Sequence, residues 1–333
     1  MNRARIMTKL LRGNYPILAT AWTDDGRFDH VSQARLIDWL IDSGVHGLVV
    51  AANASEGHAQ SDAEREAIVK FCLKRVAGRV PVIVTVTHFA VEVATEKARK
   101  AEGMGASCVM SMPQFFGNWG SDLPATFAYY KVLAAAVKIP VMVQDHPVSG
   151  VAMNADFLAR LAAEIENVSY FKLEFTQSPF KIARVLAQAG RDVKAMFGGE
   201  SGIYFIEEYE RGGRGAMPAC YLPRVFSETF RLLEAGDLAA AHALFDPYVP
   251  LLNFEVRMAN RNLWKCILKH LGVIASDRVR GPLPAYWDAE TRRQCMDHVA
   301  RLDPATFGLA LRTRRSRSSA ARHEGAVGRA AGR

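Results

Sequence analysis

Short apolar runs alternate with amphipathic segments from residue 15 to about residue 236 of this chain. The apolar runs have the length of strands and end at turn-forming residues, which predicts buried β-strands. Eight strands are expected over residues 15–22, 47–51, 81–87, 107–112, 140–145, 168–174, 193–198 and 215–220. Helices are expected over residues 31–43, 62–76, 90–103, 123–137, 154–165, 179–190, 202–210 and 224–236.

Strands that alternate with helices form a parallel sheet covered by those helices. Eight such units predict an α/β fold, a (β/α)8 TIM barrel, over residues 1–236. An open, doubly wound sheet is the alternative. It is disfavoured because no dinucleotide-binding or phosphate-binding glycine motif follows a predicted strand. In a barrel of this kind, the catalytic residues are expected at the carboxyl ends of the strands.

Only helical patterns follow, over residues 238–259, 263–271 and 288–302, which predicts a C-terminal helical appendage within residues 237–310. Residues 311–333 hold seven arginines and one acid, a charge of +6 out of the total of +8. The rest of the chain is therefore close to neutral. We interpret the tail as disordered rather than as a nucleic-acid-binding arm, because no aromatic residues or folded module accompany its charge.

The remaining composition is that of a soluble protein with a large core, since half of the 333 residues are hydrophobic. No apolar run approaches the roughly 20 residues that cross a bilayer, and the basic N-terminus lacks the apolar centre of a secretory signal. A cytoplasmic protein without a membrane partner is expected. The five cysteines are odd in number and widely spaced, which argues against a disulfide framework and a thiolate metal site.

The candidate chemistry begins in the sixth predicted strand, which contains Lys172 and Glu174. Side chains alternate along a strand, so these two share one face. Burial favours the neutral form of a lysine, which is its nucleophilic form. An ion pair without a chemical role, at the end of a strand, is the alternative interpretation.

Other polar or small residues fall at the same edge of the predicted barrel. The loop after the second strand offers backbone N–H groups that suit a carboxylate, and two glycines bring Glu200 over the barrel mouth. The candidate binding residues are Asn53, Ala54, Ser55, Gln144, His146, Gly199 and Ser201.

Several of these residues also have structural interpretations. Glu200 precedes a helix, whose dipole favours an acid there. His146 suits a loop, and His88 suits a cap or the surface. A metal site made of Asp145, His146 and Glu174 lacks the usual spacing of ligands, so no metal is expected.

The sequence resembles the dihydrodipicolinate synthase/N-acetylneuraminate lyase superfamily. The features that carry the resemblance are the lysine that ends strand six, the proline-ended fifth strand, residues 52–56 after strand two and the C-terminal helices. The resemblance covers roughly residues 12–300. It implies a class I barrel that acts on 2-oxo acids, with Lys172 as the Schiff-base lysine. It also implies a homotetramer or homodimer and no cofactor.

The sequence departs from the usual pattern of this superfamily at four places. One of them is the loop after strand four, where Gln114-Phe115-Phe116 stand near the position of a tyrosine pair. Gln144 occupies the position of the proton-relay tyrosine, and Asn53 and Ala54 replace two threonines of the carboxylate loop. No arginine follows Pro147 as it does in the synthase. Instead, Lys172 and Glu174, together with Gly198-Gly199-Glu200, resemble the L-2-keto-3-deoxyarabonate dehydratase branch, in which glutamates act in place of the tyrosine.

The resemblance therefore implies dehydration of a 3-deoxy-2-oxo sugar acid, with L-2-keto-3-deoxyarabonate giving 2-oxoglutarate semialdehyde. Glu174 is expected to move protons near C3, and Glu200 to protonate the leaving hydroxyl. Two alternatives stay open: a pyruvate-forming aldolase that uses the same Schiff base, and a barrel that binds 2-oxo acids without catalysis.

Overall fold

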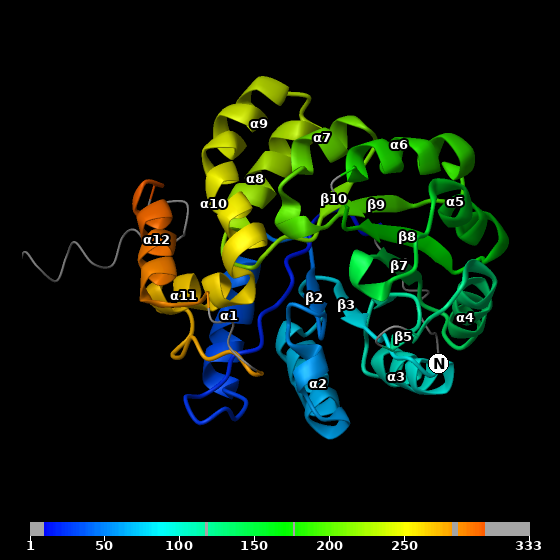
Figure 1. Ribbon diagram of the computed structural model, residues 1–333, viewed down its shortest axis with the longest axis horizontal. Helices are drawn as coiled ribbons and strands as arrows, with labels where there is room; N and C mark the ends of the chain where they lie inside the picture. The colour runs from blue at the N-terminus through cyan, green and yellow to red at the C-terminus, as the bar shows by residue number, and fades with distance from the viewer. Residues whose placement is uncertain (1–9, 117–118, 176, 282–285, 304–333) are drawn as a thin grey trace, which may run out of the picture.

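The computed structural model describes residues 10–116, 119–175, 177–281 and 286–303. At its centre, eight parallel strands follow the order β1-β10-β9-β8-β7-β4-β3-β2 (Figure 1). Their bounds are β1 Gly13–Asn14, β2 Leu48–Val50, β3 Val82–Thr85, β4 Cys108–Ser111, β7 Val141–Asp145, β8 Val168–Leu173, β9 Ala195–Gly198 and β10 Gly215–Ala216. The two further strands, β5 Phe115–Phe116 and β6 Trp119–Gly120, form a separate antiparallel pair.

Ile17 closes the barrel, because it forms parallel bridges to Val49 on one side and to Ala219 on the other. The first strand was predicted over residues 15–22, and this prediction is wrong in its bounds. Regular pairing covers only β1, and Ile17 bridges beyond it. Pro16 explains part of the interruption, since proline has no backbone N–H to donate to a neighbouring strand.

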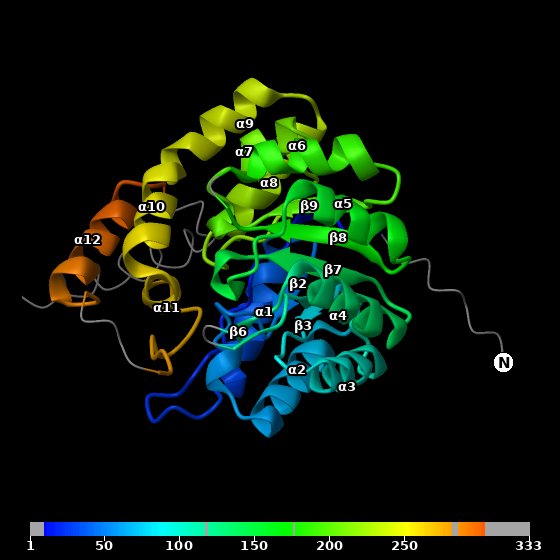
Figure 2. The same cartoon turned by 45° about the vertical axis from the view of Figure 1, so that its right-hand side comes forward.

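The helices that follow the strands lie outside the barrel, as Figures 1 and 2 show. Every residue of the eight barrel strands is buried, which is expected of a sheet enclosed by helices. The outer helices are α1 His30–Asp42, α2 Asp62–Val76, α3 Val91–Gly103, α4 Leu123–Ala135, α5 Ala155–Glu164, α6 Ser178–Ala189, α7 Phe205–Glu210 and α8 Pro223–Glu234. The predicted (β/α)8 barrel is therefore confirmed.

The C-terminal helices pack beside α8 and α1 at one side of the barrel (Figure 1). The segment predicted as one helix over residues 238–259 is divided into α9 Leu238–Phe245, a 3₁₀ turn Asp246–Tyr248, α10 Val249–Phe254 and a π-helix Glu255–Ala259. Two prolines, Pro247 and Pro250, lie at these divisions, and neither has an N–H to donate. The helices α11 Arg261–His270 and α12 Ala289–Ala300 follow.

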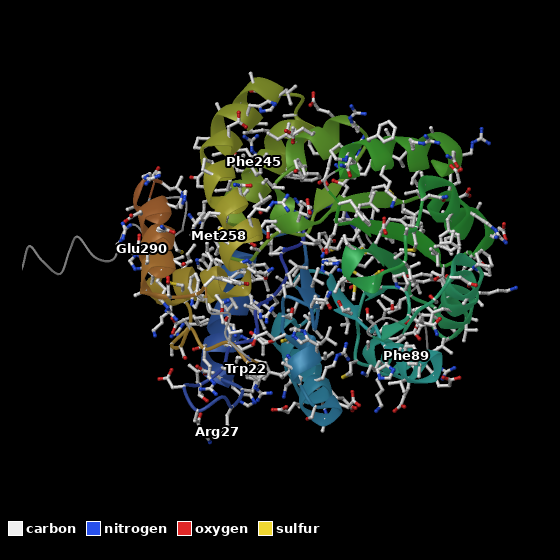
Figure 3. All side chains as sticks on the ribbon, in the orientation of Figure 1. Trp22, Arg27, Phe89, Phe245, Met258 and Glu290 are labelled. Atoms are coloured by element: carbon white, nitrogen blue, oxygen red, sulfur yellow. The ribbon has the colours of Figure 1, made fainter. Side chains whose placement is uncertain are left out.

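Aromatic packing holds α9 on the barrel. The ring of Phe245, labelled in Figure 3, lies 5.4 Å from that of Phe226 in α8 and 6.3 Å from that of Phe205 in α7, centroid to centroid. Rings at these separations attract each other beyond the burial of their area. This contact orients the segment that continues into the π-helix.

A buried ion pair joins the loop after β2 to α11. Glu56 pairs with Lys265, and its other carboxylate oxygen accepts hydrogen bonds from the indole N–H of Trp22 at 3.0 Å and the backbone N–H of Arg280 at 2.6 Å. Burial lowers the pKa of Lys265 to about 8, although Glu56 opposes this shift. The loop after β2 is thereby fixed to the C-terminal helices.

The tail predicted over residues 311–333 lies outside the described residues. Within the residues that the structure describes, no helix is long and apolar enough to cross a membrane.

Candidate active site

A cavity of about 360 Å³ opens at the carboxyl ends of the strands, and its wall includes residues from the C-terminal helices. Such a cavity is the expected place for the chemistry of a barrel of this kind. The residues that line it are Ile17, Ala52, Asn53, Ala54, His58, Gln144, His146, Pro147, Lys172, Glu174, Glu200, Ser201, Met217, Glu255, Val256, Arg257, Asn260, Arg261 and Trp264.

Lys172 and Glu174 lie together at the end of β8, with exposed fractions of only 4% and 8%. The lysine ammonium contacts one carboxylate oxygen of Glu174 in an ion pair. Burial alone would raise the pKa of Glu174, but the charge of Lys172 and a hydrogen bond from His146 lower it to about 2. The ion pair that was considered as an alternative is therefore present, and it lies on the wall of the cavity.

His146 completes this group, since its Nε2 lies 2.8 Å from the second carboxylate oxygen of Glu174. Its Nδ1 accepts a hydrogen bond from the backbone N–H of Val148 at 3.0 Å. A nitrogen that accepts carries no proton, so Nε2 is the nitrogen that donates to Glu174. His146 therefore stabilises its own loop and orients Glu174 at the same time.

The metal site considered from the sequence is not formed. Asp145 turns away to pair with Lys181, and no group of three or more histidine, cysteine, aspartate or glutamate side chains within the described residues is placed to hold a metal ion. His88 accepts a hydrogen bond from the N–H of Ala90 at 3.0 Å, just before α3, which agrees with its structural interpretation.

Glu200 reaches the cavity through a tight turn after β9. A Cβ atom on Gly199 would lie 2.0 Å from Cγ of Glu174, so only glycine fits between the two acids. Glu200 and Ser201 then adopt φ angles of 44° and 55°, and one carboxylate oxygen of Glu200 makes no hydrogen bond with a described residue. Burial and, more weakly, Glu174 raise the pKa of Glu200, while Arg257 and His146 act in the opposite direction.

The remaining predicted binding residues divide into two groups. Asn53 and Ala54 line the cavity, as does Gln144, whose buried Oε1 has no partner within the described residues. Ser55 and Gly199 are not on the cavity wall. Ser55 is buried behind it, with its carbonyl bonded to the Thr20 hydroxyl.

The lining residues that the sequence did not indicate include His58, Glu255, Arg257, Arg261 and Trp264. Glu255 is fully enclosed and accepts hydrogen bonds from Ser201, the Tyr221 hydroxyl and the Trp264 indole. Burial raises its pKa to about 7 despite these donors. Its contact with Ser201 joins the π-helix to the turn that carries Glu200. The sequence signal that could have indicated Glu255 is an acidic residue within an apolar helical pattern.

Strained backbone surrounds the cavity. Six described non-glycine residues have positive φ angles, and all of them except Ala77 lie on the cavity wall or beside it. They are Ala51, Glu56, Glu200, Ser201 and Asn260. Such conformations cost on the order of 1–3 kcal/mol each and gather at functional sites. Their distribution supports the choice of this cavity as the candidate active site.

Comparison with known proteins agrees with this geometry. The profile of the dihydrodipicolinate synthetase family matches residues 10–301. The chain belongs to this family. Its resemblance to the superfamily, first seen in residues 52–56 and Lys172, is thereby confirmed.

Two curated relatives illustrate the range within this family. The chain is 36% identical over 294 residues to L-2-keto-3-deoxyarabonate dehydratase of Azospirillum brasilense, which covers 88% of this chain and 95% of the relative. It is 30% identical over 278 residues to 4-hydroxy-tetrahydrodipicolinate synthase of Methylobacterium radiotolerans, covering 82% and 90%. Among solved structures, a putative dihydrodipicolinate synthetase from Pseudomonas aeruginosa is similar, with a TM-score of 0.82 and 28% identity, covering 88% of this chain and all of that one.

Proposed function

We propose that this member of the family is a Schiff-base dehydratase of a 3-deoxy-2-oxo sugar acid. Our candidate substrate is L-2-keto-3-deoxyarabonate, which would give 2-oxoglutarate semialdehyde and water. The observation that carries the proposal is the buried contact between Lys172 and Glu174, with Glu200 on the same cavity. The identity of 36% to a dehydratase of this substrate supports the choice of reaction.

In the proposed reaction, Glu174 takes a proton from the Lys172 ammonium, and the free amine attacks the C2 ketone. Glu174 returns that proton to the carbinolamine hydroxyl, which leaves as water and gives an iminium. The iminium withdraws electrons from C3, whose proton Glu174 removes to form an enamine. The electrons of the enamine then expel the C4 hydroxyl, which leaves as water after it takes a proton from Glu200. Loss of a proton from C5 and return of a proton to C3 give an enol, and its tautomerisation, with protonation at C4, gives the C5 aldehyde. Water then hydrolyses the iminium and releases Lys172. These steps call on no metal and no organic cofactor.

The two acids lie in environments that suit this division of roles. Lys172 and His146 keep Glu174 ionised, as a base requires, because they lower its pKa to about 2 against the effect of burial. Burial raises the pKa of Glu200, as a general acid requires. One carboxylate oxygen of Glu200 is buried without a hydrogen-bond partner among the described residues, so no protein contact holds it.

The substrate carboxylate would bind at the loop after β2. The backbone N–H group of Ala54 makes no hydrogen bond to another described residue, and Asn53 and Ala54 line the cavity. Gln144 lies opposite Lys172 in the register of β7 and β8, so its unpaired Oε1 is near the reacting carbons.

Product identification tests the proposal. The purified protein is incubated with L-2-keto-3-deoxyarabonate, and both the semialdehyde and pyruvate are measured. We expect the semialdehyde; stoichiometric pyruvate would show an aldolase instead. Borohydride reduction in the presence of pyruvate should leave an adduct on Lys172, and a protein with neither turnover nor adduct would be a binding barrel.

We also propose that the protein is cytoplasmic and assembles as a homotetramer or homodimer. Light scattering during size-exclusion chromatography measures the mass of the assembly, and a monomer would contradict this part of the proposal.

A further inference from the structure

Two arginines on the outer wall of the cavity have no partner within the described residues. Arg257 lies in the π-helix and Arg261 opens α11, and both line the cavity. The guanidinium of neither makes an ion pair or hydrogen bond with a described residue, and Nε of Arg261 is buried without an acceptor. Arg280, by contrast, forms a two-pronged pair with Glu64.

An unpaired guanidinium in a concave site is a receptor for a planar anion, since its N–H groups match a carboxylate in geometry and charge. No carboxylate of the cavity contacts these two guanidinium groups, although the charge of Arg257 acts on Glu200 from a distance. Glu174 is already paired with Lys172 and held by His146. Glu255 is enclosed by three donors of its own. The two guanidinium groups therefore remain available to an anion that enters the cavity.

The position of Arg257 and Arg261 indicates which end of the substrate these two arginines contact. Lys172, with an exposed fraction of 4%, lies at the bottom of the cavity, so the C1 carboxylate, one bond from C2, must also lie deep. The free backbone N–H group of Ala54, which lines the cavity, is available for it. Arg257 is exposed at the mouth, where its charge acts on Glu200, the acid assigned to the C4 hydroxyl. The carbons beyond C4 then extend toward the two arginines.

We propose that Arg257 and Arg261 form a subsite for a second carboxylate, at the end of the substrate away from the ketone. This inference rests on the proposed function and deepens it. The preferred substrate class becomes 3-deoxy-2-oxo dicarboxylic sugar acids, and monocarboxylic acids such as L-2-keto-3-deoxyarabonate are weaker substrates of the same reaction.

The test compares two six-carbon acids that differ only at C6. One is a 3-deoxy-2-oxohexonate, which ends in a hydroxymethyl group, and the other is the matching hexarate, which ends in a carboxylate. A charge-assisted hydrogen bond contributes about 1.5–3 kcal/mol, so we expect kcat/KM to favour the hexarate by about 10- to 100-fold. Arg257→Gln and Arg261→Gln should each reduce this ratio by about 10-fold or more.

Arg224→Gln is the matched control, because Arg224 is an exposed arginine of α8 that does not line the cavity. It should preserve the ratio. Equal losses for both acids in the cavity variants would place the C1 carboxylate on the arginines and overturn the proposal. So would a wild-type protein without preference, or one that prefers only the 6-phosphate ester of the hexonate.

A second readout separates this inference from the proposed function. The two acids compete with pyruvate for borohydride trapping at Lys172, which requires no dehydration. If the hexarate competes better than the hexonate and the arginine variants abolish the difference, the subsite stands even when no water is lost. If both acids lose water with equal efficiency and compete equally with pyruvate for trapping at Lys172, the dehydratase function is supported and the carboxylate subsite is contradicted.

Discussion

Replacing Gly199 by alanine should disable the candidate site without unfolding the barrel. The new Cβ would lie 2.0 Å from Cγ and 2.8 Å from Cδ of Glu174. Carbon atoms in contact need about 3.5 Å, so Glu174 must move by about 1.5 Å. That movement breaks its contacts with Lys172 and His146. Misplacement of about 1 Å costs on the order of 10²-fold in rate, and overpacking costs about 1–3 kcal/mol of stability.

The assay for Gly199→Ala combines turnover of the sugar acid, borohydride trapping with pyruvate and unfolding in urea. We expect kcat to fall about 10²-fold or more, with a cooperative unfolding transition retained. Gly103→Ala is the matched control, because a Cβ at that position of α3 meets nothing within 4 Å. It should keep full activity. Wild-type turnover in Gly199→Ala would show that the position of Glu174 does not matter, and the proposed mechanism would lose its base.

The remaining predictions concern three groups of acids. Glu174→Gln and Glu200→Gln should each lower turnover on the order of 10²-fold while pyruvate is still trapped; wild-type rates in both would remove them from the mechanism. Lys265→Met, which leaves Glu56 buried without its counter-ion, should cost about 3–5 kcal/mol in urea unfolding, and adding Glu56→Gln should restore much of it. Burial raises the pKa of Glu208 to about 8. Its contribution to the free energy of unfolding is therefore complete below about pH 4.5 and is lost as the pH rises toward 8, at about 1.4 kcal/mol per pH unit. Glu208→Gln should remove this slope from unfolding curves recorded between pH 5 and 8, and an unchanged slope would contradict the assignment.

The barrel and the bottom of its cavity were predictable because strand alternation is a local rule. Once residues 168–174 are recognised as a strand, Lys172 and Glu174 must share a face, and parallel neighbours bring Gln144 beside them. The first strand was misplaced because its apolar composition suggests continuous pairing. Pro16 interrupts that pairing, as proline lacks the N–H that a ladder needs.

The outer wall of the cavity was not predictable by these rules. Glu255 and Arg257 follow the barrel in sequence, inside a segment whose pattern indicates only a helix, and Arg261 lies between two such segments. Whether a helical acid or arginine faces a cavity or solvent depends on the packing of that helix on the barrel, and the period of the helix does not determine this packing. The π-helical turn adds a rotation that a pattern of 3.6 residues does not anticipate.

The contact between the loop after β2 and the C-terminal helices has a consequence for how this protein is made. The backbone N–H of Arg280 bonds to Glu56 across 224 residues, and Lys265 neutralises the same acid. During synthesis the early domain of a chain folds before the later residues leave the ribosome. The nascent barrel would then hold an uncompensated carboxylate near its mouth until almost the whole chain has emerged. The loop after β2 therefore reaches its final set of contacts only after Arg280 has been synthesised.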